Sequence, residues 1–229
     1  MRTNYGLSRS CFDEAIRRNS SFEKAWFGKG AALELLGKYN ESIQAFDNAI
    51  MLNPQSAKAW YNKGVVLDYL GKYNESIQAY NKAIELNPQY ADSWNNKGKA
   101  FDDLGKHDEA IQAFDKAIKL NPQLAAAWYN KGGALANQGK YNESIQSFDK
   151  AIDINPQFTM AWYNKGVVFD HLGKYEEGIQ AYDKAVELNP QFAAAWYNKG
   201  VALYHLSKYN ESIQAFDKSI DINPQFAVA

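Results

Sequence analysis

Tryptophan recurs at a fixed interval along the chain, and this interval limits the possible folds more than any other feature. Successive tryptophans are 34 residues apart, no insertion or deletion breaks the register, and the prolines follow the same interval. A fixed period of this length indicates one supersecondary unit that is copied and stacked, because each unit buries its apolar face against its neighbours. The sequence therefore predicts a solenoid without a single central core. The tryptophans are Trp26, Trp60, Trp94, Trp128, Trp162 and Trp196, and the prolines are Pro54, Pro88, Pro122, Pro156, Pro190 and Pro224.

Residues 57–90 illustrate the repeating unit. Apolar and aromatic residues at helical spacing predict a first helix over 57–70, and Gly71 then favours a left-handed cap that ends it. A second amphipathic helix is predicted from about residue 74 to 86. Asn87-Pro88 ends this helix, because the residue before proline avoids helical angles and proline suits the start of the next helix. Each unit is thus expected to be an antiparallel helical hairpin.

Several positions of this unit resemble the tetratricopeptide repeat in identity and spacing. After Trp60 come Gly64, then Ser76 and Tyr80 four residues apart, and Pro88 closes the unit. The resemblance implies an all-α fold, a right-handed superhelical solenoid of antiparallel helix-turn-helix repeats, with the first helices on its concave face. It covers almost the whole chain: a partial repeat (second helix only) at 1–22, six repeats at 23–56, 57–90, 91–124, 125–158, 159–192 and 193–226, and a tail at 227–229.

Two repeated positions predict how the hairpins pack. A small residue such as Ser76 lets the two helices approach closely, and the ring at Tyr80 or its equivalents fills the space beside it. Three residues after each tryptophan stands a lysine, where the family usually has leucine. We expect its stem to pack on aromatic surface while the ammonium reaches water, and a basic stripe that binds a ligand is the alternative. These lysines are Lys29, Lys63, Lys97, Lys131, Lys165 and Lys199.

Composition argues against several classes of partner. Lys and Arg number 25 against 26 Asp and Glu, so no net field attracts nucleic acid or an acidic membrane. Cys11 has no partner for a disulfide within the chain and no Cys/His cluster beside it, which is typical of a reducing compartment. Neither a signal-peptide pattern in residues 1–22 nor an apolar run long enough to span a membrane is evident. We therefore expect a cytoplasmic protein.

Catalytic signatures are absent from the sequence. There is no phosphate loop, nucleophile elbow or metal-ligand spacing, and the histidines are His107, His171 and His205. The last two occupy the same place in successive repeats, but a metal between them would need further ligands. We therefore expect no catalytic residues, no cofactor and no metal site, and we predict that the chain is not an enzyme.

Two ladders of side chains mark the predicted binding face of the first helices. Tyrosine usually follows the tryptophan and asparagine follows the tyrosine. An asparagine amide both donates and accepts, so a row of them suits the peptide units of an extended chain, as in the repeat region of certain sugar-transferring enzymes that this row resembles. The candidate groove residues are Tyr61, Asn62, Asn95, Asn96, Lys99, Tyr129, Asn130, Tyr163, Asn164, Tyr197 and Asn198.

These observations predict a non-enzymatic scaffold that binds an extended segment of a partner protein in its groove. Aspartates among the groove positions favour a neutral or basic segment. Selectivity, if it is encoded, is expected first where repeat 3 departs from the rest and next where repeat 4 does. These departures are Asn95, Lys99, Asp102, Asp103 and His107 in repeat 3, and Gly133, Ala136 and Asn137 in repeat 4. Two alternatives stay open: a solenoid that self-assembles into homo-oligomers through uncapped ends, and a repeat region that belongs to a larger multidomain protein.

Overall fold

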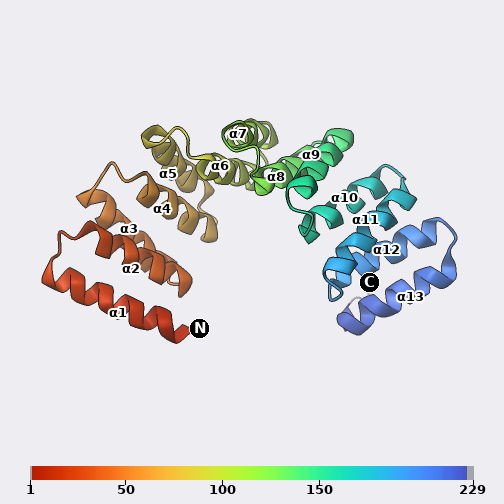
Figure 1. The fold of residues 1–229 in the computed structure, drawn as a ribbon, viewed down its shortest axis with the longest axis horizontal. Coiled ribbons are helices and arrows are strands. Elements are labelled where there is room, and N and C mark those ends of the chain that lie inside the picture. The colour runs from red at the N-terminus through yellow and green to blue at the C-terminus, as the bar shows by residue number, and fades with distance from the viewer. Residues whose placement is uncertain (1, 226–229) are drawn as a thin grey trace. The chain divides into compact units, whose positions relative to one another are not determined.

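The computed structural model describes residues 2–225, so the tail at 227–229 lies outside the described residues. Within this range the chain forms thirteen α-helices and no strand, which confirms the all-α class (Figure 1). The helices are α1 (Arg2–Arg18), α2 (Glu23–Leu35), α3 (Tyr39–Leu52), α4 (Ala57–Tyr69), α5 (Tyr73–Leu86), α6 (Ala91–Asp103), α7 (His107–Leu120), α8 (Ala125–Asn137), α9 (Tyr141–Ile154), α10 (Thr159–His171), α11 (Tyr175–Leu188), α12 (Ala193–His205) and α13 (Tyr209–Ile222).

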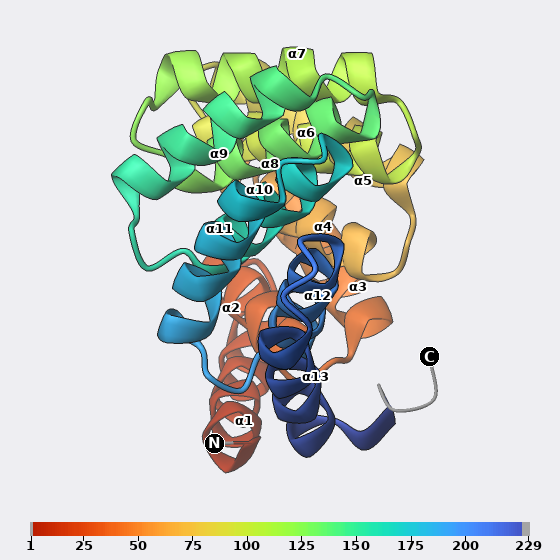
Figure 2. The same cartoon turned by 90° about the vertical axis from the view of Figure 1, so that its right-hand side faces the viewer.

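The helices are grouped into two compact units, one spanning Met1–Asn121 and the other Pro122–Ala229. In each unit, a first helix packs against the second helix of its own repeat and against the second helix of the repeat before it. In the first unit α4 contacts α3 and α5, and in the second unit α12 contacts α11 and α13. Figure 2 shows α12 and α13 side by side as such a pair. Within each unit, the first helices α2, α4, α6, α10 and α12 are therefore each sandwiched between two second helices.

The turn inside each hairpin depends on a residue in the left-handed region. Gly71 has φ +69°, and its N–H donates to the carbonyl of Asp68, while the N–H of Lys72 donates to the carbonyl of Leu67. This arrangement pairs the last carbonyls of α4 and confirms the predicted glycine cap. In the last repeat Ser207 takes the same role with φ 59°, a conformation that costs a side-chain-bearing residue free energy.

Close helix contact inside a hairpin depends on two small residues. A Cβ added to Gly64 would lie 2.6 Å from Cε1 of Tyr80, so only glycine fits against this ring. Across the same contact, in other repeats, a buried serine donates to the carbonyl of the glycine: Ser144 Oγ lies 2.7 Å from Gly132 O. Helix approach and ring filling follow the expectation from the sequence, and the serine also pairs a helix carbonyl.

The tryptophans join successive repeats. Trp162 packs with Ala151, Ile152 and Ala161 in one buried cluster. Its indole Nε1 donates to the carbonyl of Pro156 at 3.1 Å, in the turn just before its own helix. The repeated tryptophan is thus tied to the turn that precedes its helix, and Trp26 makes the same bond to the carbonyl of Ser20.

Candidate functional site

The asparagine and tyrosine ladders are hydrogen-bonded to each other across repeats. Asn96 Nδ2 donates to the hydroxyl of Tyr61 at 3.1 Å, from α6 to α4. In the second unit Asn164 donates to Tyr129 at 2.9 Å and Asn198 donates to Tyr163 at 3.1 Å. We call the surface that these side chains form on the first helices the ladder face. The asparagine therefore has a structural role, orienting one repeat on the next, which sequence reasoning did not identify.

Exceptions in one ladder change the bonding in the other. Phe27 stands where the preceding repeat would supply a tyrosine hydroxyl to Asn62, and Asn62 instead donates to the carbonyl of Lys58 in its own helix at 2.7 Å. In repeat 3, Asn95 replaces the tyrosine, is buried, and donates to the Oδ1 of Asn96 at 3.1 Å. Asn130 and Tyr197 occupy the ladder positions of α8 and α12.

The tyrosine rings of the ladder pack into the junction between repeats. The Tyr61 ring centroid lies 4.8 Å from that of Tyr90 and 6.0 Å from that of Tyr80. Burial raises the pKa of Tyr61 to about 12, and the nearby carboxylate of Asp92 adds to the shift. The hydroxyl is therefore protonated at neutral pH and serves as a fixed acceptor for the asparagine. What the ladder face offers to a ligand is mainly the asparagine amides.

Two aspartates beside the ladder form hydrogen bonds that sequence reasoning missed. Tyr80 Oη donates to Asp68 Oδ2 at 2.6 Å, and Tyr182 Oη donates to Asp170 Oδ2 at the same distance. A signal was present in the sequence: repeats 2 and 5 carry tyrosine at the ring position where the other repeats carry phenylalanine, and both carry aspartate twelve residues before it. The sequence pattern alone indicates the ring as a filler of space and the aspartates as groove charges, but not the hydrogen bond that joins them.

Only one of the two oxygens of each carboxyl group accepts a hydrogen bond. The second oxygen, Oδ1, of both Asp68 and Asp170 is buried without a hydrogen-bond partner. In repeat 5 glycine makes room for it, since a Cβ on Gly178 would lie 2.6 Å from Asp170 Oδ1. Burial raises the pKa of Asp68 and of Asp170, although the tyrosine hydroxyl partly opposes the shift in each case. The ionised form is therefore disfavoured in the folded state.

This shift predicts a pH dependence of stability. Because the folded-state pKa of Asp170 lies above the unfolded value, the folded protein binds more protons between the two values, and the free energy of unfolding rises as pH falls through this window. Asp170→Asn keeps an oxygen acceptor for Tyr182 but removes the titration. Denaturant unfolding of both proteins from neutral to acidic pH is expected to show wild type gaining stability relative to the variant. A carboxyl titrating at or below its ordinary pKa in ¹³C NMR would contradict this.

Charges of both signs surround the ladder in repeat 3. Lys99 is exposed, and burial raises the pKa of Asp103 while Lys99 opposes that shift. His107 Nδ1 lies 2.6 Å from Asp102 Oδ1. The predicted groove residue Lys99 is thus close enough to Asp103 for their charges to interact.

His171 and His205 are ring-stacking residues. The imidazole of His171 lies parallel to the ring of Tyr141, with centroids 5.5 Å apart, and His205 stacks on Tyr175 at 4.5 Å. Each histidine comes from the repeat that follows its tyrosine. Across residues 2–225, no group of three or more His, Cys, Asp or Glu side chains is arranged to hold a metal ion.

The repeated lysine lies away from the ladder face and is paired. Lys63 Nζ lies 5.5 Å from the centroid of the Trp60 ring and 2.6 Å from Asp47 Oδ1 of the preceding repeat. Lys29, Lys165 and Lys199 make the equivalent contacts with Asp13, Asp149 and Asp183. The stem packs on the indole as expected, but the ammonium ends in an ion pair and not simply in water, because the preceding second helix supplies a carboxylate.

Lys97 departs from this pattern. The preceding repeat has Asn81 at the position of the aspartate, and Lys97 instead contacts the rings of Trp94 and Phe101, at 4.9 and 5.7 Å from their centroids. Burial lowers the pKa of its ammonium group.

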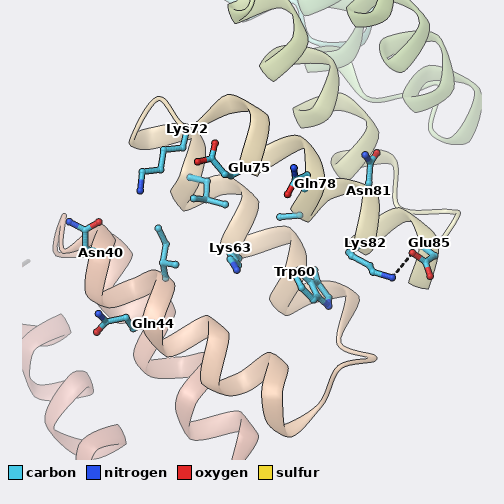
Figure 3. A pocket seen from close by; sticks show the side chains of 13 residues that line it. Asn40, Gln44, Trp60, Lys63, Lys72, Glu75, Gln78, Asn81, Lys82 and Glu85 are labelled. Atoms are coloured by element: carbon cyan, nitrogen blue, oxygen red, sulfur yellow. Dashed lines mark hydrogen bonds and ion pairs between the residues drawn. The ribbon is translucent and has the colours of Figure 1, made fainter.

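A large cavity lies on the lysine side of the first unit and not at the ladder. It has a volume of about 830 Å³ and is lined by α3, α4 and α5 (Figure 3). Trp60 and Lys63 lie along its α4 wall, while Lys82 and Glu85 form an ion pair at 2.7 Å on α5. Similar, smaller hollows beside Trp128, Trp162 and Trp196 show that this cavity is a product of the repeat. No ladder residue lines any of them.

Comparison with solved structures supports the fold. A crystal structure of MamA is 26% identical with a TM-score of 0.66, and the match covers 72% of this chain and 97% of that one. YrrB, described as a TPR protein with an unusual peptide-binding site, is 24% identical with a TM-score of 0.64 and coverage of 82% and 97%. The Cut9-Hcn1 hetero-tetramer of APC/C is 18% identical with a TM-score of 0.78, covering 98% of this chain and 44% of that one. A sequence search of curated proteins found no match.

Family models extend this result to the sequence. Two family models, both described as Tetratricopeptide repeat, match the chain. One matches residues 23–56 and 57–90, and the other matches residues 95–157, 155–191 and 163–225. No helix among the described residues is both long and apolar enough to cross a membrane. The matches span most of the chain, and the hairpins, the glycine–ring contacts and the tryptophan–proline junctions account for the residues that these models share. The chain therefore belongs to the tetratricopeptide repeat family.

Proposed function

We propose that the chain is a non-enzymatic scaffold whose ladder face binds an extended peptide segment of a partner protein. The observation that carries the proposal is that one N–H of Asn96, Asn164 and Asn198 is held by the tyrosine of the preceding repeat. An amide has two N–H groups and an oxygen with two lone pairs, so Asn164, bonded to Tyr129, keeps both a donor and an acceptor for a ligand. Fixing these groups before binding lowers the entropic cost of association.

Spacing and charge support an extended peptide of neutral or basic character as the ligand. Amides at the same position of successive repeats suit a peptide backbone, because backbone donors and acceptors recur whatever the side chains. Asp92 and Asp103 on α6 are exposed carboxylates, and Lys99 on the same helix is the one opposing ammonium among the candidate groove residues. Charge complementarity then favours a neutral or basic segment over an acidic one. The fold is typical of protein–protein interaction, and YrrB shows that it can carry a peptide-binding site.

The test separates binding from structure by removing either partner of the same two hydrogen bonds. One variant carries Asn164→Ala and Asn198→Ala, and the matched variant carries Tyr129→Phe and Tyr163→Phe. Both lose two inter-repeat bonds, so both are expected to lose similar stability, about 0.5–1.5 kcal/mol per bond. The probe is a peptide selected by the wild-type chain from a random phage-displayed library.

Calorimetric titration of that peptide is expected to show a loss of about tenfold or more in affinity for the asparagine variant only, equivalent to about 1.4 kcal/mol. The tyrosine variant keeps the amides and is expected to bind within a few-fold of wild type. Equal affinity of both variants and the wild-type chain would reject the ladder as the binding element.

A further inference from the structure

The ladder face of the second unit contains a cavity at the junction of repeats 4 and 5. It has a volume of about 230 Å³ and lies between α8, α9 and α10. One ladder residue, Asn164, belongs to its lining. We call it the repeat-4 pocket; it is lined by Gly133, Ala136, Asn137, Tyr141, Phe148, Asn164, Val167, Val168 and His171.

Small side chains on α8 leave this space open. Repeats 2 and 5 carry valine where repeat 4 has Gly133, and they carry Asp68 and Asp170 where repeat 4 has Ala136. In those repeats the aspartate is held by the tyrosine hydroxyl of the second helix. Repeat 4 has Phe148 instead of that tyrosine, so neither partner of the pair is present. A Cβ placed on Gly133 would meet no atom within 4 Å, which shows that the space beside it is unfilled.

The lining suits a ring with a polar edge. Phe148 is 1% exposed and Val168 is 2% exposed, so both are held in place by packing at the base of the pocket, and most of its accessible surface is polar. Tyr141 and His171 lie parallel, with an angle of 3° between their planes, and present an aromatic wall. The amides of Asn137 and Asn164 supply donors and acceptors, and no Asp, Glu, Lys or Arg lines the pocket. A dry cavity of about 150 Å³ lined by apolar side chains holds benzene, so a 230 Å³ pocket has room for an aromatic ring.

We propose that the repeat-4 pocket takes a neutral aromatic side chain of the peptide bound on the ladder face. The proposal rests on the proposed function, since the peptide backbone lies along the asparagine ladder that contributes Asn164. Its own support is independent of the ladder: the volume, the aromatic wall and the uncharged lining. The backbone contacts give affinity for any extended chain, whereas the pocket gives this chain a preference for one residue type.

Two measurements test the pocket. In the first, ¹³C-methyl NMR of the full chain is titrated with p-cresol, and n-butylammonium serves as the cationic control. Shifts of the Val167 and Val168 methyls with p-cresol but not with the amine are expected. In the second, peptides selected by the wild-type chain from a random phage library are expected to share an aromatic residue, and its replacement by alanine is expected to weaken binding about tenfold or more.

Gly133→Val is the key variant, because it installs the residue that repeats 2 and 5 carry at this position. It also removes a glycine from a helix interior, where glycine is unfavourable, so the variant is expected to fold. It is expected to abolish the p-cresol shifts and to bind the aromatic peptide and its alanine form with equal affinity. Gly133→Ala, with a smaller side chain, is the matched control and is expected to keep part of the preference.

The outcomes separate this proposal from the proposed function. Selected peptides without an aromatic preference, together with no p-cresol shifts, overturn the pocket and leave the ladder function standing. Valine methyl shifts that Gly133→Val removes, with no peptides selected, support the pocket and reject the ladder function. An aromatic preference that survives Gly133→Val places the ring elsewhere and overturns the assignment.

Discussion

Replacing Gly132 by alanine is expected to destabilise the chain by about 1–3 kcal/mol, whereas the same change at the adjacent Gly133 is expected to stabilise it by about 0.5–1 kcal/mol. The two glycines follow each other in α8, so the change in helix propensity is the same. A Cβ on Gly132 would lie 2.7 Å from Cε1 of Phe148, but a Cβ on Gly133 would meet nothing within 4 Å. The difference between the two changes in the free energy of unfolding therefore measures the steric clash with Phe148, separately from the gain in helix propensity.

Denaturant unfolding monitored by circular dichroism gives both values. The Gly132 variant is expected to unfold at a lower denaturant concentration than wild type, and the Gly133 variant at a higher one. Phe148 is buried and its ring packs beside Tyr129, with centroids 5.9 Å apart, so the ring has little free space to move into. Equal midpoints for the two variants would show that the ring adjusts at little cost.

The sequence was sufficient to predict the fold because each repeat encodes it again. Gly71 and Pro88 end the helices, and Gly64 and Tyr80 are in contact within one hairpin, so all of these inferences depend on residues close in sequence. Local signals of this kind need no knowledge of how repeats are placed. Copies of the pattern then remove most of the ambiguity that a single motif would leave.

The candidate site could be predicted only in part, because its bonds join different repeats. Asn164 and Tyr129 are 35 residues apart, and nothing in the periodic pattern shows that the amide of one meets the hydroxyl of the other. The row of asparagines was therefore interpreted as a ligand surface without a structural role. The structure adds that role and leaves the binding role as a proposal.

Differences between repeats contained information that the consensus hid. The joint occurrence of Tyr182 and Asp170 in one repeat, and of the equivalent pair in repeat 2, indicates a contact that neither residue indicates alone. Gly133 and Ala136 had been singled out as departures, but only the packing of α9 and α10 shows that they leave a cavity. Whether a deletion of side-chain volume opens a pocket depends on what fills the space from neighbouring helices.

The largest loss of stability is expected from truncating a ring inside the array. Phe114→Ala removes a side chain that is 1% exposed and packs against Gly98, and should cost about 3–5 kcal/mol from lost burial and the cavity left behind. Phe216 occupies the same position of the last repeat but is only half-buried, so Phe216→Ala should cost clearly less.

The position of the ring also predicts where the protein opens. Because each repeat of a solenoid is stabilised mainly by its neighbours, a weak interior repeat disconnects the helices on either side, whereas a weak terminal repeat frays alone. Amide hydrogen exchange is expected to show lost protection in α4 to α7 for Phe114→Ala, and losses confined to α12 and α13 for Phe216→Ala. A uniform loss of protection along the whole chain in both variants would mean that the array unfolds as one cooperative body, and the energetic independence of the repeats would have to be abandoned.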